Sequence, residues 1–281
     1  MLYKQINRIS KNFIKENLEI FFKEDDIKND ITTNTVVDKK RIIKANFIAE
    51  FEGVFCGSKI IENAFSESVK VSVLIKDGFK VKENFKLATI EGPASEILKK
   101  ERVVLNLIQR MSGVASETQK YTAKAFRKNI KILDTRKTTP GLRLFEKYAA
   151  QCGGGSNHRF NLSKGIMIKD NHIESNKNIK EIFAKLNKRK VPIQVEIETK
   201  KQLQECLKYN VDAVLLDNMI PQEIKECIQI IKKLNQKIFI EVSGGITLKT
   251  LNRYLISGVD AISVGATIHQ ATFKNIKLEF L

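Results

Sequence analysis

The chain between residues 130 and 264 repeats one rhythm, and this rhythm constrains the fold more than any other feature. Short apolar runs of strand length occur at residues 130–133, 166–168, 193–197, 213–216, 238–242 and 261–264. Amphipathic stretches separate them at residues 144–152, 179–189, 200–208, 222–233 and 248–255. Strands that alternate with helices of this length predict βαβ units and a parallel sheet. Six candidate strands indicate a barrel or an incomplete one, in which the carboxyl ends of the strands carry the chemistry.

The first hundred residues carry different signals. Residues 7–24 have apolar side chains near helical spacing and predict an amphipathic helix, whereas residues 30–34 are expected to form a loop. Short alternating runs with turn sequences between residues 42 and 92 predict a small, mostly antiparallel sheet packed on one or two helices. A further helix is predicted over residues 95–110, with helical character resuming as far as residue 125.

Length and charge bound the possible classes. A chain of 281 residues corresponds to about two domains. Its net charge of +17, from 49 basic and 32 acidic residues, raises the possibility of a basic nucleic-acid-binding protein. However, the lysines are spread along the chain without a basic arm, and they accompany abundant isoleucine and asparagine, as an A+T-rich base composition would produce. We therefore expect no nucleic-acid partner.

The sequence shows no sign of a membrane or secretory segment. No apolar stretch approaches the roughly 18 residues of a membrane span, and no apolar run follows the first basic residues as in a signal peptide. The chain is therefore expected to be cytoplasmic and without a membrane partner. Its four cysteines have no zinc-type spacing and are expected to be buried or idle thiols. They are Cys56, Cys152, Cys206 and Cys227.

Cationic residues follow the first two predicted strands of the repeating region. Arg136, Lys137 and Arg143 come after the strand at 130–133, where they could hold carboxylates or phosphates; a solvated loop is the alternative. Three glycines then precede His158 and Arg159, and glycine lets a backbone approach a ligand closely.

Lys169 ends the next predicted strand, where a barrel would present it at the mouth. His172 follows three residues later and is open to a structural interpretation.

Carboxylates follow the middle strands. Glu196 and Glu198 alternate with aliphatic residues, so both lie on one face of their strand. Asp217 occupies the matching position one strand later. Together Glu198 and Asp217 could bind Mg²⁺, with oxygens of a phosphorylated sugar completing the coordination. A structural salt bridge to Lys169 or Arg159 is the alternative.

The last two predicted strands end in small residues. Ser243, Gly244 and Gly245 follow one strand, and Gly265 follows the other. Loops after the late strands of α/β barrels often bind phosphate through exposed backbone N–H groups. The sequence therefore predicts the phosphate end of a ligand at these loops.

In this order the motifs resemble those of the quinolinate phosphoribosyltransferases (nicotinate-nucleotide pyrophosphorylases, carboxylating). The resemblance spans nearly the whole chain and is densest from Glu101 to Gly265. The motifs that carry it are Glu101-Arg102-Val-Val-Leu-Asn106, Arg110-Met-Ser112-Gly113, Asp134-Thr-Arg136-Lys137-Thr-Thr-Pro140-Gly141, Gly153-Gly-Gly-Ser-Asn-His158-Arg159, Lys169-Asp170-Asn171-His172, Val195-Glu196-Ile-Glu198, Leu216-Asp217-Asn218 and Val242-Ser243-Gly244-Gly245.

The resemblance implies an architecture and an assembly. The fold would be α/β, with an N-terminal α/β sandwich domain over residues 1–101 and an incomplete parallel, TIM-like α/β barrel over residues 102–269. The C-terminal tail, residues 270–281, would pack back on the first domain. The family's enzymes work as homodimers, and this chain would form a homodimer or a higher homo-oligomer in which Arg102 is donated across the interface.

The resemblance also implies residue roles. The chain would transfer phosphoribosyl from phosphoribosyl pyrophosphate (PRPP) to quinolinate with decarboxylation, in NAD biosynthesis, and would use Mg²⁺. Lys137, Lys169, Glu198 and Asp217 would be catalytic, and the two acids would hold Mg²⁺ directly or indirectly. Quinolinate would bind to Arg102, Arg136, His158, Arg159 and Lys169. PRPP would bind to Lys137, Glu198, Asp217, Ser243, Gly244, Gly245, Gly265 and His269.

Two alternatives remain open at this point. The molybdenum-transport-associated paralogues share the fold and many of these motifs, but their pattern usually lacks Lys-Asp-Asn-His after the His-Arg block. A basic nucleic-acid-binding protein would explain the net charge, but it gives no reason for acidic residues at the strand ends.

Overall fold

The computed structural model describes residues 1–176, 178–186, 190–234 and 237–281. The chain forms two compact units, each built from several segments. Unit 1 comprises residues 1–5, 120–138 and 155–269, and unit 2 comprises residues 6–119, 139–154 and 270–281. No helix in these described ranges is both long enough and apolar enough to cross a lipid bilayer.

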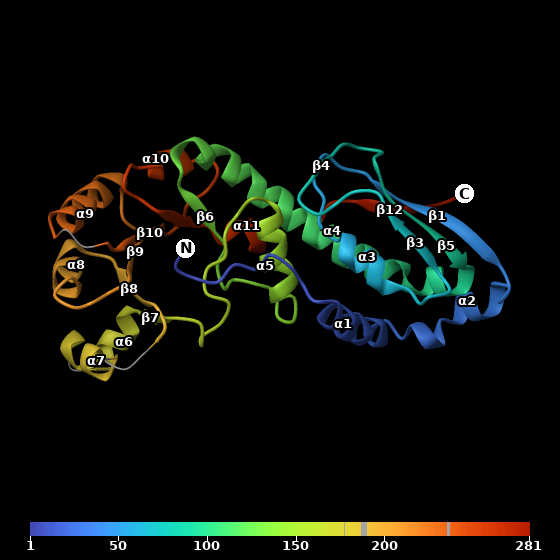
Figure 1. The fold of residues 1–281 in the computed structure, drawn as a ribbon, viewed down its shortest axis with the longest axis horizontal. Helices are drawn as coiled ribbons and strands as arrows, with labels where there is room; N and C mark the ends of the chain where they lie inside the picture. The colour runs from blue at the N-terminus through green and yellow to red at the C-terminus, as the bar shows by residue number, and fades with distance from the viewer. Residues whose placement is uncertain (177, 187–189, 235–236) are drawn as a thin grey trace. The chain divides into compact units, whose positions relative to one another are not determined.

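Unit 2 contains a four-stranded antiparallel sheet (Figure 1). Its strands, in spatial order, are β12 (Ile276–Phe280), β1 (Ile42–Ala49), β5 (Lys86–Pro93) and β3 (Lys70–Val73). The short strands β2 (Gly53–Val54) and β4 (Lys80–Val81) pair separately. Strand β12 joins the sheet at β1, with Leu278 opposite Phe47, so the end of the chain completes the sheet that the first hundred residues begin. This arrangement fits the predicted antiparallel sheet.

Helices of unit 2 agree with the sequence in position but differ at their ends. They are α1 (Lys11–Glu24), α2 (Ile31–Val36), α3 (Ser58–Ala64), α4 (Ala94–Ala125) and α5 (Arg143–Cys152). The loop predicted at residues 30–34 is wrong, because the side chain of Asp30 accepts a hydrogen bond from the N–H of Thr33 and caps α2. The helix predicted in two pieces from residue 95 is one uninterrupted helix, α4.

Helix α4 spans residues 101 and 102, where the sequence places the domain boundary. The helix continues through that point, and the chain passes from unit 2 to unit 1 at residues 119 and 120, still within α4. Its apolar side chains Ile97, Val104 and Ile108 are fully buried, which explains why the helix is not interrupted there.

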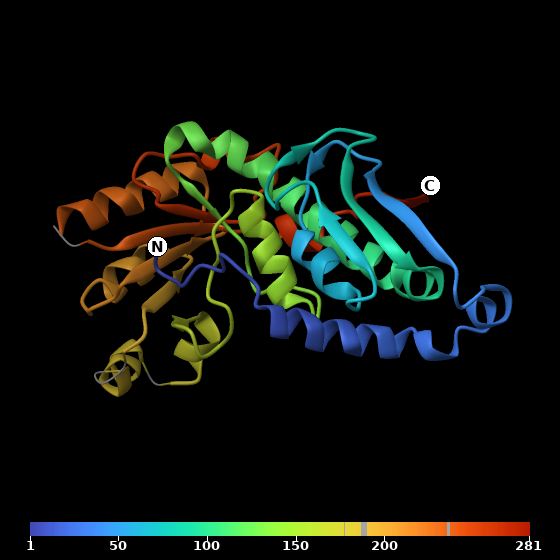
Figure 2. The same cartoon turned by 45° about the vertical axis from the view of Figure 1, so that its right-hand side comes forward.

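Unit 1 contains a six-stranded parallel sheet with the order β6-β11-β10-β9-β8-β7. The strands are β6 (Lys131–Leu133), β7 (Ile166–Ile168), β8 (Ile193–Ile197), β9 (Ala213–Asp217), β10 (Phe239–Ser243) and β11 (Ala261–Ser263). All six predicted strands are therefore confirmed to within one residue or so at their ends. The first strand lies beside the last, and β7 lies at the opposite edge (Figure 2).

Helices connect the strands of unit 1 in the predicted alternation. They are α6 (Asp170–Glu174), α7 (Ile179–Leu186), α8 (Lys200–Cys206), α9 (Pro221–Lys233), α10 (Leu251–Tyr254) and α11 (Ala266–His269). The end of the helix predicted at 179–189 lies outside the described residues. Within α9, the buried side chains Ile224, Ile228 and Ile231 pack into the same core as Val214 and Val242 of the sheet. This packing covers the apolar face of the sheet, and the predicted site residues of this unit lie at the carboxyl ends of its strands.

Candidate functional site

The second face of the unit 1 sheet is polar. Val195 and Ile197 of β8 belong to the apolar core, whereas Gln194 and Glu196 alternate with them and so lie on the opposite face. The same alternation in β10 places Glu241 on that face. Gln194 and Glu241 are fully buried, so the interior beneath the strand ends contains polar groups that need partners.

Asp134, directly after β6, fixes the loop that carries His158 and Arg159. It is almost completely buried. One of its carboxylate oxygens accepts the N–H of His158 at 2.9 Å, and the other accepts the side-chain amide of Asn157 at 2.6 Å. The loop therefore starts from a fixed position rather than from a flexible glycine hinge.

His158 is held by protein groups at both ring nitrogens. Its Nδ1 accepts the N–H of Arg159 at 2.8 Å, and its Nε2 lies 3.5 Å from Oε1 of Glu241. The imidazole also lies against the ring of Tyr3, with the centroids 4.7 Å apart. These contacts favour a role in positioning Arg159 over the predicted direct contact with substrate.

Glu241 lies at the centre of a buried hydrogen-bond network that sequence reasoning missed. Gln194 donates to its Oε2 at 2.7 Å, the hydroxyl of Ser263 donates to its Oε1, and Tyr3 donates to the Oε1 of Gln194 at 2.8 Å. Burial and the charges of Asp134 and Asp217 raise the pKa of Glu241, the hydrogen bonds from Ser263 and Gln194 lower it, and the resulting pKa is about 7. The sequence signal for this network is the alternation of Glu241 with aliphatic residues inside its strand, away from the strand end.

Arg159 and Arg136 form the cationic part of the site. Arg159 is only 7% exposed and donates from Nη1 to the carbonyl of Gly165 at 2.9 Å. Burial lowers the pKa of Arg159, and the neighbouring charge of Arg136 lowers it further. Within the described part of the chain, neither guanidinium forms an ion pair with a carboxylate. Two adjacent arginines without a carboxylate partner among the described residues are suited to a ligand with more than one negative charge.

Lys169 ends β7 and pairs with Glu196, with 2.6 Å between Nζ and Oε2. The N–H of Lys169 donates to Nδ1 of His172, so His172 fixes the end of the strand. Glu196, within β8, therefore forms the salt bridge to Lys169 that the sequence left open for Glu198, the residue that directly follows β8. Glu198 stays available for another partner.

Glu198 lies in a cluster of carboxylates. Asp170 is the largest cause of its raised pKa, and Asp217 and Glu196 add to the effect through their charges. Asp217 is oriented by the hydroxyl of Ser243, which donates to its Oδ1 at 2.6 Å. Asp170, Asp217 and Glu196 lie close enough to raise the pKa of Glu198, and hard oxygen ligands of this kind fit Mg²⁺. The donor set thus matches the predicted metal.

Glycine is required at the loop after β10. Gly244 has a φ of +102°, and a Cβ there would lie 2.3 Å from Oδ1 and 2.6 Å from the backbone N of Asn218. Gly245 has a φ of +57° but no neighbouring atom near an added Cβ. The loop therefore packs closely on the residue that follows Asp217, which places the two strand ends next to each other.

The loop after β11 brings three predicted residues together. A Cβ added to Gly265 would lie 3.2 Å from the ring of His269 and 3.2 Å from Cδ of Lys137. Lys137 and His269 therefore meet at Gly265, although they are far apart in the sequence. Both side chains are exposed.

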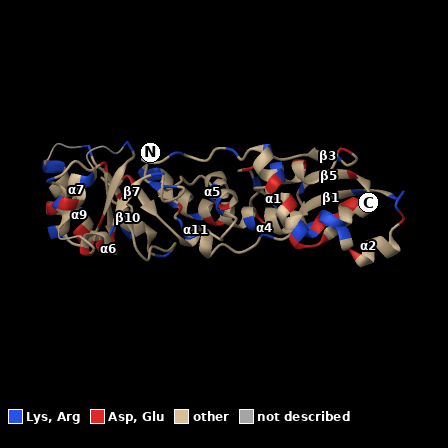
Figure 3. Ribbon diagram, turned by 90° about the horizontal axis from the view of Figure 1, so that it is seen from below, with Lys and Arg blue, Asp and Glu red and all other residues tan. Residues whose placement is uncertain are grey.

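Every predicted site residue except Arg102 thus belongs to unit 1. Arg102 is exposed on the part of α4 that belongs to unit 2, and Arg143 begins α5 in the same unit. Figure 3 shows basic and acidic residues interspersed within each unit, in keeping with the dispersed lysines of the sequence. A cavity of about 440 Å³ in unit 1 is bounded by Arg159, Gly165 and side chains of β7 and α7.

A parallel α/β sheet with cations, carboxylates and glycine loops at its strand ends is characteristic of enzymes that act on phosphorylated ligands. The comparison with protein families identifies which of these enzymes the chain resembles. A model of the quinolinate phosphoribosyl transferase N-terminal domain matches residues 30–112, and a model of the C-terminal domain of the same family matches residues 114–279. The chain belongs to the quinolinate phosphoribosyltransferase family.

Individual relatives match over almost the full chain. The probable nicotinate-nucleotide pyrophosphorylase [carboxylating] of Bacillus subtilis is 40% identical over 272 residues, which cover 95% of this chain and 93% of the relative. The crystal structure of the nicotinate-nucleotide pyrophosphorylase from Ehrlichia chaffeensis is 37% identical, with a TM-score of 0.89 and coverage of 98% and 100%. The enzyme of that name from Francisella tularensis has a TM-score of 0.92 at 31% identity, with 99% of each chain covered.

Proposed function

We propose that this chain transfers the phosphoribosyl group of PRPP to the ring nitrogen of quinolinate and releases CO₂. The products are nicotinate mononucleotide, pyrophosphate and CO₂, a step of NAD biosynthesis. The observation that carries the proposal is the pair of neighbouring arginines, Arg136 and Arg159. They belong to the same unit as the carboxylate cluster around Glu198, which lies at the carboxyl ends of the parallel strands. The names of the relatives support the same activity.

Quinolinate is a dicarboxylate, and the arginines are suited to its two anionic groups. A guanidinium binds a carboxylate through two parallel N–H groups. The guanidinium of Arg159 donates to the carbonyl of Gly165, and the backbone N–H of Arg159 donates to the His158 ring. We infer that His158 positions Arg159, while Arg136, after β6, and Lys169, after β7, contact the acid. Paired cations also offset the cost of removing a dianion from water.

The sugar is expected to bind at the later strand ends. Lys137, Gly265 and His269 meet after β11, and Ser243, Gly244 and Gly245 follow β10; these groups would contact the phosphate and the pyrophosphate. Glu198 and Asp217 would hold the ribose hydroxyls and Mg²⁺. When bound there, Mg²⁺ would neutralise charge on the pyrophosphate.

Charge development explains why these groups lie where they do. As the bond from the anomeric carbon to pyrophosphate breaks, positive charge grows on the sugar and negative charge on the leaving oxygens. Lys137 and Lys169 would stabilise the leaving group, and Glu198 and Asp217 would favour the cationic sugar. Groups fixed in advance and directed at developing charge commonly contribute roughly 3–4 kcal/mol each.

Decarboxylation requires no further reactive group from the protein. Once the ring nitrogen carries the ribose, the pyridinium ring stabilises the electron pair that stays on the ring carbon when the C–C bond to CO₂ breaks. A proton from solvent then completes the product. The task of the chain is to hold both carboxylates while the bond to the ring nitrogen forms, which again depends on the arginines.

The division of the chain and its assembly stay proposals. We propose an N-terminal domain of residues 1–101 that includes the tail 270–281, supported by the pairing of β12 with β1, and a catalytic domain of residues 102–269. We also propose a homodimer in which Arg102 reaches the partner's site. A cytoplasmic location remains a prediction of the sequence.

The decisive experiment uses purified protein with quinolinate, PRPP and Mg²⁺. We expect equal amounts of nicotinate mononucleotide and of CO₂ derived from the carboxylate next to the ring nitrogen. Nicotinate is the matched control, because it lacks that carboxylate and should be a poor substrate. Comparable turnover of the two acids would rule out the proposed recognition, and no turnover of quinolinate would favour another phosphorylated ligand, as in the molybdenum-associated paralogues.

A further inference from the structure

Unit 2 brings together two cysteines and an aspartate that are far apart in the sequence. Cys56 follows β2, Asp77 lies in the turn before β4, and Cys152 ends α5. Their sulfur and carboxylate oxygen atoms all lie within 4.8 Å of one another. The approach of these segments depends on Gly78, where φ is +87° and an added Cβ would lie 3.2 Å from the carbonyl oxygen of Cys152.

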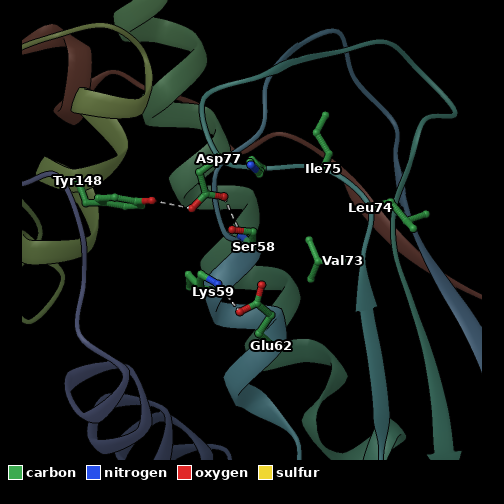
Figure 4. Close-up of a pocket in the computed structure, with 9 residues that line it drawn as sticks. Ser58, Lys59, Glu62, Val73, Leu74, Ile75, Asp77 and Tyr148 are labelled. Carbon is green, nitrogen blue, oxygen red and sulfur yellow. Dashed lines mark hydrogen bonds and ion pairs between the residues drawn. The ribbon is translucent and has the colours of Figure 1, made fainter.

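The carboxylate of Asp77 is oriented before any ligand binds. Its Oδ1 accepts the N–H groups of Gly57 and Ser58, both at 2.8 Å. Its Oδ2 accepts the hydroxyl of Tyr148 at 2.8 Å, as Figure 4 shows. In metal sites, hydrogen bonds of this kind hold a carboxylate ligand in place and tune its strength. The groups that would support a ligand are therefore already present around Asp77.

A cavity leads to this carboxylate. It has a volume of about 450 Å³ and is lined by Asp77, Tyr148, Ser58 and side chains of α3 and β3 (Figure 4). Water or an ion could reach Asp77 through it, whereas neither cysteine lines the cavity and Cys56 is fully buried. Cys152 is partly exposed.

We propose that Cys56, Asp77 and Cys152 bind a Zn²⁺ ion, with a water molecule from the cavity as the fourth ligand. Zinc bonds of roughly 2.0–2.3 Å in tetrahedral geometry place ligand atoms roughly 3.5–4 Å apart, and the three groups are close enough to adopt that spacing. Two thiolates and one carboxylate suit zinc better than Mg²⁺ or Ca²⁺, which prefer oxygen ligands. On binding, each thiol releases its proton to solvent, and no electron is transferred.

The ion would connect three segments of unit 2, namely the start of α3, the turn before β4 and the end of α5. Its effect is therefore expected on the stability of that unit. The inference is independent of the proposed transferase activity, because none of its residues belongs to the strand-end site. The expectation that the cysteines are idle came from their spacing in the sequence. Spacing cannot predict a cluster whose members come from distant segments of the chain.

Cobalt provides the test, because thiolate coordination gives it a charge-transfer absorption in the near ultraviolet. Full-length protein is stripped of metal with a chelator, kept reduced with a phosphine and titrated with Co²⁺. We expect one equivalent to give this band together with the visible bands of tetrahedral Co²⁺, and Zn²⁺ to abolish both. Zinc should also raise the melting temperature. Cobalt at the carboxylates of unit 1 would give no charge-transfer band, so the two sites are distinguishable.

Three variants locate the site. C152S should lower the charge-transfer absorption at least by half, because Cys56 is then the one remaining thiolate ligand of the cluster, and should lose the zinc-dependent rise in melting temperature. D77N should weaken cobalt binding by about tenfold or more, while its remaining oxygen still accepts the two N–H groups. C206S removes an isolated buried thiol of unit 1 and should bind cobalt as the unchanged protein does. Absence of the band in the unchanged protein, or a band of undiminished intensity in C152S, overturns the proposal. The proposal is also overturned if the reduced protein takes up no cobalt and Cys56 and Cys152 form a disulfide in air.

Discussion

Nε2 of His158 lies 3.5 Å from Oε1 of Glu241, a carboxyl group with no exposed surface. Because Nδ1 of the same ring accepts the N–H of Arg159, the ring has its proton on Nε2 and directs it toward Glu241. A buried acid therefore sets the orientation of the loop that carries the main cation of the site. This contact links the interior of the sheet to the substrate-binding loop, and the titration of Glu241 provides a test of it.

Glu241→Gln should change how stability depends on pH. Burial raises the pKa of Glu241 from 4.5 to about 7, so the folded protein holds this proton more tightly than the unfolded chain does. Stability contributed by the protonated form is present below about pH 4.5 and is lost as the pH rises through about 7. Glutamine cannot ionise, and relative to the unchanged protein the variant should gain up to roughly 3 kcal/mol across this window.

Urea unfolding of both proteins at several pH values measures this difference. Glu174→Gln, which removes an exposed carboxylate at the end of α6, is the control and should leave the pH profile unaltered. Parallel profiles for Glu241→Gln and the unchanged protein would show that the carboxyl group titrates normally.

Gly244→Ala should disrupt the loop after β10. The added methyl group would lie 2.3 Å from Oδ1 of Asn218, and the φ of +102° is unfavourable for alanine. We expect a loss of stability on the order of 1–3 kcal/mol and a raised KM for PRPP. Gly245→Ala is the matched comparison, since its methyl group meets no atom and its backbone strain costs only about 1–2 kcal/mol. Thermal melts and PRPP saturation curves separate the two, and equal effects would mean that the contact with Asn218 is unimportant.

The strands of unit 1 could be predicted from sequence because each is a short apolar run between clear helical patterns. Their ends could be predicted as well, since Lys169 and Asp217 are polar residues at the point where an apolar run stops. Helix α2 could not, because its threonines and asparagine favour other conformations and only the cap at Asp30 indicates a helix.

The interior network could not be predicted for a different physical reason. Glu241 and Gln194 each look like an unfavourable polar residue within an apolar strand, and their burial is explained only by each other and by Tyr3, which comes from the start of the chain. The periodicity of a sequence describes one helix or strand at a time, whereas these three partners come from three separate segments of the chain. The same limit applies to His158, whose protein contacts favour a positioning role that its place in the motif did not suggest.

Glu198→Gln should raise the Mg²⁺ concentration needed for activity. Asp170 and Asp217 raise the pKa of Glu198, so these carboxylates lie close enough to share a cation. Removing one of the charges should weaken Mg²⁺ binding by about tenfold or more. Activity measured across a Mg²⁺ titration gives the half-saturating concentration, and Glu174→Gln is again the control for loss of one surface charge. An unchanged Mg²⁺ requirement would count against a metal at Glu198.

Arg136→Ala should affect quinolinate more than PRPP. Its charge lies next to Arg159, and the pair is expected to hold the dicarboxylate. Arg136 is exposed, and losing its charge-assisted hydrogen bonds to a carboxylate should cost about 1.5–3 kcal/mol, or roughly tenfold or more in affinity. Binding of each substrate can be measured separately by calorimetry, and Arg143→Ala serves for comparison, because Arg143 is also a candidate to hold an anion but lies at the start of α5 in unit 2. Equal losses for both substrates would contradict the assigned role.

Arg102→Ala and Lys169→Ala, each inactive alone, should regain activity when their subunits are mixed. If Arg102 is donated across a dimer, half of the mixed molecules are heterodimers with one intact site of two, which gives about a quarter of full activity. Mixing Lys137→Ala with Lys169→Ala is the control, because both lysines belong to unit 1 and no subunit pairing restores a site. Subunit exchange is verified by mass difference between tagged and untagged chains. Without recovery after verified exchange, Arg102 would have to act within its own subunit or outside the site.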